Sequence, residues 1–164
     1  LNDISKDHPD EIVNTALAWL GESNSTDKLV KHACRTLLKQ GREDVMTLFG
    51  FTDPSHIELS DFTLQELLGV GDSLSFSFSL ATQQTVLGKI RLEYAIDFMK
   101  SKGKTSRKVF SISESNCDTQ LKSVTKKHAF KLISTRIYYP GMHSLAIIVN
   151  GKEMVKGNFN LINK

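Results

Sequence analysis

The sequence predicts a two-domain α+β fold, with a helical segment over residues 1–53 followed by an all-β immunoglobulin-like sandwich over residues 54–164. Apolar residues recur at helical spacing before Pro54, whereas after Pro54 they alternate with polar residues, as they do in half-buried strands. Each part also contains a cluster of cations. Clustered cations favour an anionic partner, so we expect the two parts to hold one polyanion together.

Three helices are predicted in the first part. Pro9 followed by two acidic residues indicates a helix start, and Gly21 indicates its end. A second helix is expected over 26–40 and a shorter third helix over 42–49. Helix pairs joined by short loops are the units that stack into α-solenoids.

The second part predicts about seven strands. Residues 73–80 alternate strictly between small polar and large apolar side chains, and residues 90–98 do the same. Asn150-Gly151 indicates a two-residue hairpin turn before the last strand. This strand content over about 110 residues is typical of an immunoglobulin-like sandwich. The strands are expected at 57–61, 73–80, 90–98, 108–113, 124–132, 144–149 and 153–161.

Net charge, hydrophobicity and cysteine content indicate which class of protein this is. The net charge is +3, with six Lys/Arg against nine Asp/Glu before Pro54 and fifteen against nine from Pro54 onward. No apolar run approaches the roughly 20 residues that a membrane span requires. The two cysteines, Cys34 and Cys117, form neither a disulfide framework nor a zinc motif, which favours a reducing cytoplasm. We expect a monomer with no metal and no cofactor.

A basic stripe is predicted on the second helix. Lys28, Lys31, His32, Arg35 and Lys39 are spaced so that they share one helix face. Phosphates bind such faces, and each contact adds salt-dependent affinity. The alternative interpretation is an ordinary solvated helix face.

A second basic cluster is predicted in a loop between two strands. Residues 100–108 hold five cations and no acid, and four of these cations are our candidate DNA contacts: Lys102, Lys104, Arg107 and Lys108. Such a loop can follow a phosphate backbone. Its alternative interpretation is a hairpin tip that only aids solubility.

Several stretches together resemble one family. They are residues 1–9, residues 30–39 followed by Gly41, and, in the β part, residues 128–130, 134–136, 139–143 and 149–151. These stretches resemble the AlkC-type alkylpurine DNA glycosylases, which are HEAT-repeat DNA alkylation repair proteins with an appended Ig-like domain. The resemblance implies that residues 1–53 are a C-terminal HEAT-like repeat. It also implies removal of cationic N-alkylated purines, such as 3-methyladenine, from double-stranded DNA in base-excision repair.

The same resemblance makes Asp3 the candidate catalytic residue. An alkylated purine is already cationic and leaves readily, so the enzyme has to stabilise an oxocarbenium-like sugar and position a water. A carboxylate beside the sugar can do both. The alternative for Asp3 is a solvent-facing or helix-capping carboxylate.

Three functions remain open from the sequence. The first is the C-terminal part of a DNA glycosylase, whose Ig-like domain helps to enclose damaged DNA. Because earlier repeats would be missing, the isolated chain should bind DNA weakly and should not excise bases. The second is a non-catalytic DNA-binding module, and the third is a protein-interaction module.

Overall fold

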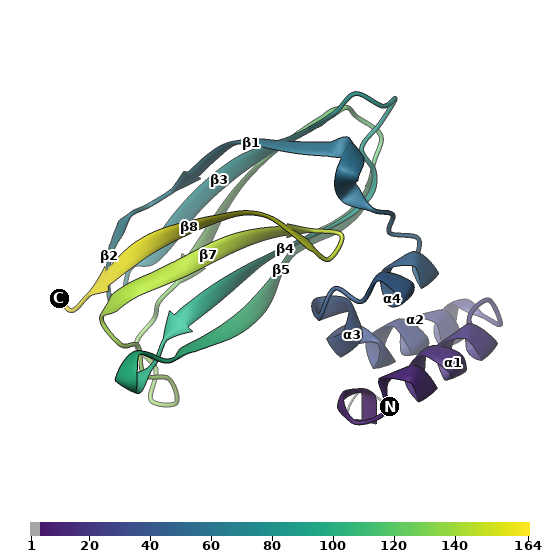
Figure 1. The fold of residues 1–164 in the computed structure, drawn as a ribbon, viewed down its shortest axis with the longest axis horizontal. Coiled ribbons are helices and arrows are strands. Elements are labelled where there is room, and N and C mark those ends of the chain that lie inside the picture. The colour runs from purple at the N-terminus through teal and green to yellow at the C-terminus, as the bar shows by residue number, and fades with distance from the viewer. Residues whose placement is uncertain (1–3) are drawn as a thin grey trace. The chain divides into compact units, whose positions relative to one another are not determined.

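The computed structural model describes residues 4–164, and Asp3 lies outside them. The described chain forms two compact units (Figure 1). We call one the helical unit, which runs to Asp53 and includes Asn150–Lys152. The other, the sandwich unit, comprises Pro54–Val149 and Glu153–Lys164.

Strand outweighs helix, 48% to 25%, so the predicted HEAT-repeat domain ahead of an Ig-like sandwich was wrong. The helix expected over 26–40 breaks at Cys34, whose φ of −86° and ψ of 3° depart from helical geometry. The helices that follow have only five and six residues, too short for the stacked pairs of a helical repeat. The helices are α1 (Pro9–Trp19), α2 (Asn24–Ala33), α3 (Arg35–Lys39) and α4 (Glu43–Leu48), with 3-10 turns η1 (Ile4–Lys6) and η2 (Pro54–His56).

The helical unit nevertheless has a core of its own. Ile12 and Ala16 from α1 pack with Val30 from α2 and with buried residues of α3 and α4. The Ser23 hydroxyl accepts a hydrogen bond from the Thr26 amide at 3.1 Å and so caps α2.

Two sheets make up the sandwich unit. One has the order β1-β3-β6 and the other β2-β8-β7-β4-β5, and β2 joins β8 in parallel whereas the other registered pairs are antiparallel. β5 and β6 are therefore edge strands. The strands are β1 (Ile57–Leu64), β2 (Leu67–Gly69), β3 (Ser73–Thr82), β4 (Gly88–Met99), β5 (Thr105–Cys117), β6 (Leu121–Ala129), β7 (Gly141–Val149) and β8 (Lys152–Ile162).

The main core lies between the two sheets. On β3, Leu74, Phe76, Phe78 and Leu80 are buried while the intervening serines are half-buried, as strict alternation requires. These side chains belong to one cluster with apolar residues of β4, β7 and β8. Removing one of the phenylalanines would cost about 3–5 kcal/mol.

The central strands β4 and β7 are buried on both faces. The face of this sheet that points away from the core has small residues at its centre, where Ala95 of β4 is paired with Ala146 of β7 and Val109 of β5. Long polar side chains can cover such small residues. This outer face therefore has the ion pairs described below.

An aromatic cluster fills one end of the core. His128 on β6 lies 4.7 Å from Phe110 and 5.3 Å from Phe130 between ring centroids, and its Nδ1 is 2.8 Å from the Tyr94 hydroxyl oxygen. Its Nε2 is buried and has no hydrogen-bond partner among the described residues. Burial, together with the charge of Arg136, lowers the pKa of His128 to about 4.

This lowered pKa predicts a loss of stability in mild acid. The unfolded chain takes up a proton near pH 6.5, whereas folded His128 stays neutral down to about pH 4. The stabilisation is therefore fully present above pH 6.5 and is lost as the pH falls toward 4. Between pH 7 and pH 5 we expect His128 to account for a loss on the order of 2 kcal/mol in the free energy of unfolding, measured by urea denaturation.

His128→Phe should flatten this part of the pH profile, because it removes the titrating group. The control is His32→Gln, since His32 is exposed. Equal pH dependence in the unsubstituted chain and in His128→Phe would show that His128 is not the group responsible.

Candidate functional site

The turn between β4 and β5 has two exposed lysines at its tip. Lys102 and Gly103 both adopt left-handed backbone conformations, with φ of 62° and 71°, within the 3-10 turn η3 (Ser101–Gly103). The Lys100 amide donates to the Lys104 carbonyl oxygen at 2.7 Å and closes the turn. Lys102 and Lys104 are thereby held at the end of the sandwich with their side chains in solvent.

The chain between β6 and β7 reaches the same end of the sandwich, where both connections appear in green in Figure 1. Lys100 and Lys108 from the β4–β5 hairpin line a shallow depression together with Arg136 and Tyr138 from the β6–β7 connection. The Lys100 ammonium lies 5.7 Å from the centre of the Phe98 ring, which also lines the depression. Three cations thus converge over an aromatic floor.

These cations have no ionic partner within the described chain. Residues 4–164 place no carboxylate within 4.0 Å of any of them, and residues 100–108 and 130–140 contain no acidic residue. Unpaired, converging cations attract an external anion, and phosphate oxygens suit both ammonium and guanidinium groups. We call this set the basic end: Lys100, Lys102, Lys104, Lys108 and Arg136.

His143 fixes the position of the β6–β7 connection. The Met99 amide donates to Nδ1 at 3.1 Å, so the ring proton lies on Nε2, which donates to the Tyr139 carbonyl oxygen at 2.8 Å. Burial lowers the pKa of His143, the bond to Tyr139 opposes that shift, and the Lys100 charge adds to it. The neutral imidazole therefore links the end of β4 to the chain that supplies Arg136.

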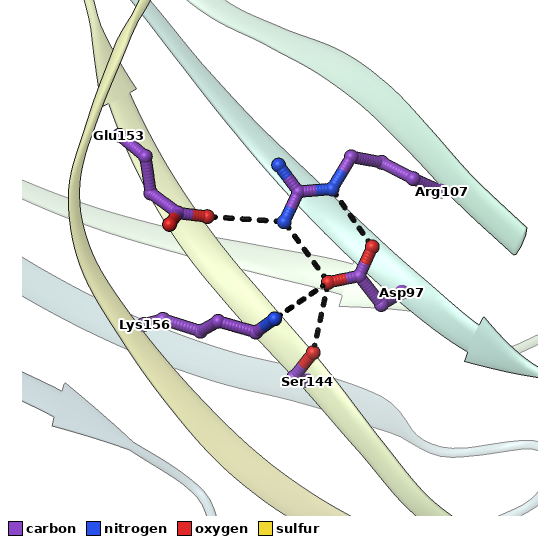
Figure 2. Close-up of polar contacts among 5 residues, drawn as sticks. All are labelled: Asp97, Arg107, Ser144, Glu153 and Lys156. Atoms are coloured by element: carbon purple, nitrogen blue, oxygen red, sulfur yellow. Dashed lines mark hydrogen bonds and ion pairs between the residues drawn. The ribbon is translucent and has the colours of Figure 1, made fainter. Parts of the chain in front are cut away.

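Arg107, which was predicted as a DNA contact, has carboxylate partners within the protein. Its Nε and Nη2 donate to the two Asp97 carboxylate oxygens at 2.8 and 3.0 Å, and Nη2 also donates to Glu153 at 3.0 Å (Figure 2). Ser144 donates to Asp97 at 3.0 Å, and the Lys156 ammonium lies 3.1 Å from the same carboxylate. The charge of Arg107 is neutralised on the outer face, so we leave Arg107 out of the candidate site.

These donors also determine the protonation of Asp97. Hydrogen bonds from Arg107 hold the pKa of Asp97 well below its usual range, although partial burial acts in the opposite direction. Bonds from Lys156 and Ser144 lower it further. Asp97 is therefore a fixed anion that joins β4, β5, β7 and β8.

The predicted basic stripe of the helical unit is divided. Lys31 and His32 lie on α2, whereas Arg35 and Lys39 lie on α3 beyond the break at Cys34. The Lys31 ammonium lies over two aromatic rings, 6.0 Å from the centre of Phe49 and 5.6 Å from that of Phe51. His32, Arg35 and Lys39 are exposed.

Metal-binding clusters and membrane-spanning helices are both absent from the described part of the chain. Residues 4–164 contain no group of three or more His, Cys, Asp or Glu residues that could hold a metal ion. Within the same residues, every helix is too short or too polar to cross a bilayer.

A family model for the C-terminal Ig-like domain of the uncharacterised protein YhaZ matches residues 58–163. The chain belongs to this family. It is also 43% identical over 154 residues to the uncharacterized protein YhaZ of Bacillus subtilis (strain 168), covering 93% of the chain and 43% of that protein. The assignment to the AlkC-type family was therefore wrong: residues 58–163 match the Ig-like domain of the YhaZ family, and residues 4–164 contain no HEAT-repeat part.

Solved structures provide a second comparison. Pseudomonas fluorescens alkylpurine DNA glycosylase AlkC, bound to DNA containing an abasic site analog, is similar with a TM-score of 0.89 and 28% identity, over 98% of this chain and 45% of that one. A β-glucosidase from Listeria innocua is similar in fold, with a TM-score of 0.54 and 14% identity, over 66% of this chain and 16% of that one. The chain spans less than half the length of YhaZ and AlkC. The likeness to AlkC indicates a fold related to DNA repair.

The difference between paired and unpaired cations predicts different effects on DNA binding. Replacing Lys108 and Arg136 together by Gln should reduce the slope of log K against log salt by about two, because two phosphate contacts are lost. Arg107→Gln should leave the slope unchanged. It should lower the free energy of unfolding by about 1 kcal/mol, a small effect because the Arg107 side chain is 41% exposed and solvent screens its ion pairs.

Fluorescence anisotropy with a labelled duplex, over a series of salt concentrations, measures these slopes. A reduced slope for Arg107→Gln together with an unchanged slope for the Lys108/Arg136 variant would place the anion site on the outer face instead.

Proposed function

We propose that this chain is the DNA-gripping part of a longer protein that removes alkylated purines from duplex DNA. The observation that carries the proposal is the basic end, whose five cations have no ionic partner in the described chain and three of which line one depression. The likeness to a glycosylase structure that contains DNA supports the same partner.

The shape of the basic end suits a duplex backbone. Lys102 and Lys104 at the tip can contact one run of phosphates while Lys100, Lys108 and Arg136 contact another across the depression. Such contacts orient a protein on DNA without reading its sequence. A repair protein that has to find damage in any sequence needs this kind of grip.

The helical unit supplies a second set of proposed phosphate contacts. His32, Arg35 and Lys39 are exposed and lie within one stretch of α2 and α3. Lys31 already lies over two aromatic rings and is the weakest member of the set.

The proposed reaction is hydrolysis of the bond between sugar and alkylated purine. The positive charge on the base favours its departure, and the developing oxocarbenium charge on the sugar is stabilised by a nearby carboxylate. We assign this role to Asp3 because it is the carboxylate predicted from the sequence of residues 1–9. A carboxylate of this kind leaves substrate binding largely intact when it is replaced by its amide.

Base release is the experiment that tests the proposal. The longer protein should release methylated purines from alkylated duplex DNA, and Asp3→Asn should lower the single-turnover rate by about 10²–10³-fold with little change in DNA affinity. The Lys108→Gln/Arg136→Gln variant should instead lose affinity first, with its rate restored at saturating protein.

Asp7→Asn is the matched control, because Asp7 is an exposed carboxylate close to Asp3 in sequence. Full activity in Asp3→Asn would remove Asp3 from the proposal. Salt-dependent DNA binding without base release would instead identify a non-catalytic DNA-binding module, and the absence of both would identify a protein-interaction module.

A further inference from the structure

The connection between β6 and β7 has an exposed apolar tip. Leu132, Ile133 and Ile137 are 76%, 49% and 69% exposed. Loop tips are usually built from Gly, Pro, Asn, Asp and Ser, and large aliphatic side chains grouped in solvent mark an interaction site. We call these three residues the apolar tip.

A hydrogen-bonded turn shapes the apolar tip. The Arg136 amide donates to the Ile133 carbonyl oxygen at 3.2 Å, and Ile133 and Arg136 form an isolated antiparallel bridge. Ser134 and Thr135 lie at the turn itself. The aliphatic side chains therefore lie on both arms of a narrow projection.

The base of this projection is held firmly. Phe130 is fully buried, its amide donates to the Asp72 carbonyl oxygen at 2.9 Å, and its own carbonyl oxygen accepts from the Gly71 amide at 2.9 Å. Tyr138 packs on Phe130, with ring centroids 5.0 Å apart, and His143 binds the carbonyl oxygen of Tyr139. Because its base is anchored, the short tip can insert into a partner while keeping its own conformation.

Cations surround the apolar tip. Lys131 precedes Leu132, Arg136 precedes Ile137, and residues 129–143 contain no acid. Ile137 also lines the depression with Lys100 and Lys108, so the tip adjoins the basic end. The partner must therefore offer anionic groups beside a surface that accepts aliphatic side chains.

Duplex DNA meets both requirements. Proteins that bind the minor groove insert Leu, Ile or Met between base steps while cations hold the flanking phosphates. We propose that the apolar tip inserts into a base step of duplex DNA from the minor groove, with the basic end on the adjoining phosphates. This inference rests on the proposed function, because it takes duplex DNA as the partner.

Opening a base step requires unstacking energy in an intact duplex, and it requires the least where a base is damaged or missing. An inserting tip would therefore bind more tightly at lesions than at intact steps. Insertion would therefore allow this part of the protein to prefer damaged DNA. Contacts to the phosphate backbone alone provide no such preference.

A duplex with 2-aminopurine beside an abasic-site analogue tests the insertion, because this base brightens when it is unstacked. The unsubstituted chain should raise the fluorescence, and the variant Leu132→Ser/Ile133→Ser/Ile137→Ser should lose that rise. The salt slope of its binding should stay unchanged, since every cation remains. Leu67→Ser/Leu121→Ser is the matched control, because both leucines are exposed apolar residues outside the tip, and it should keep the rise.

The outcomes separate this inference from the proposed function. Two results would overturn the insertion and leave DNA binding in place. Either the unsubstituted chain binds in a salt-dependent way without a fluorescence rise, or the triple variant keeps the rise. The absence of salt-dependent binding overturns both. Tip-dependent flotation with phosphatidylserine vesicles, without a fluorescence rise on DNA, overturns the insertion in favour of an anionic membrane surface.

Discussion

The ion pair between Asp97 and Arg107 is the interaction on which the arrangement of charge in the sandwich unit depends. Asp97 lies on β4 and accepts from side chains of β5, β7 and β8, so one carboxylate ties four of the five strands of its sheet together (Figure 2). The Asp97 side chain is only 16% exposed. A carboxylate that is this buried stays ionised only because cations and hydrogen-bond donors compensate its charge. Arg107 and Lys156 are consequently committed to the protein itself.

This commitment leaves the unpaired cations at one end of the sandwich. The outer face carries balanced pairs around Asp97, and a second set around Arg91, Glu93 and Glu114. The basic end has no such compensation within the described residues, and its potential is therefore available to a partner. The apolar tip extends from the same end, so electrostatic attraction and insertion would act on one stretch of DNA.

Alternation of apolar and polar residues predicted much of the sandwich, because a strand that is buried on one face has to alternate. Strands such as β3 and β4 were close to expectation, whereas β2 was missed because three residues contain no period. The prediction of a helical repeat was wrong because the spacing of apolar residues over 26–40 does not indicate the break at Cys34. Charge spacing predicted Lys102, Lys104, Arg107 and Lys108 alike as DNA contacts. It could not show that Arg107 has carboxylate partners, because these come from other strands. Arg136 was missed for the same reason, since only folding brings it beside Lys100.

The most direct test of this account is the acetylation rate of each lysine, measured by mass spectrometry with and without duplex DNA at low salt. If the unpaired cations form the DNA contact, DNA should slow the acetylation of Lys100, Lys102, Lys104 and Lys108 and leave that of Lys156 unchanged. Slower acetylation of Lys156, with no change at the other four, would contradict the account. It would move the DNA contact to the outer face around Asp97.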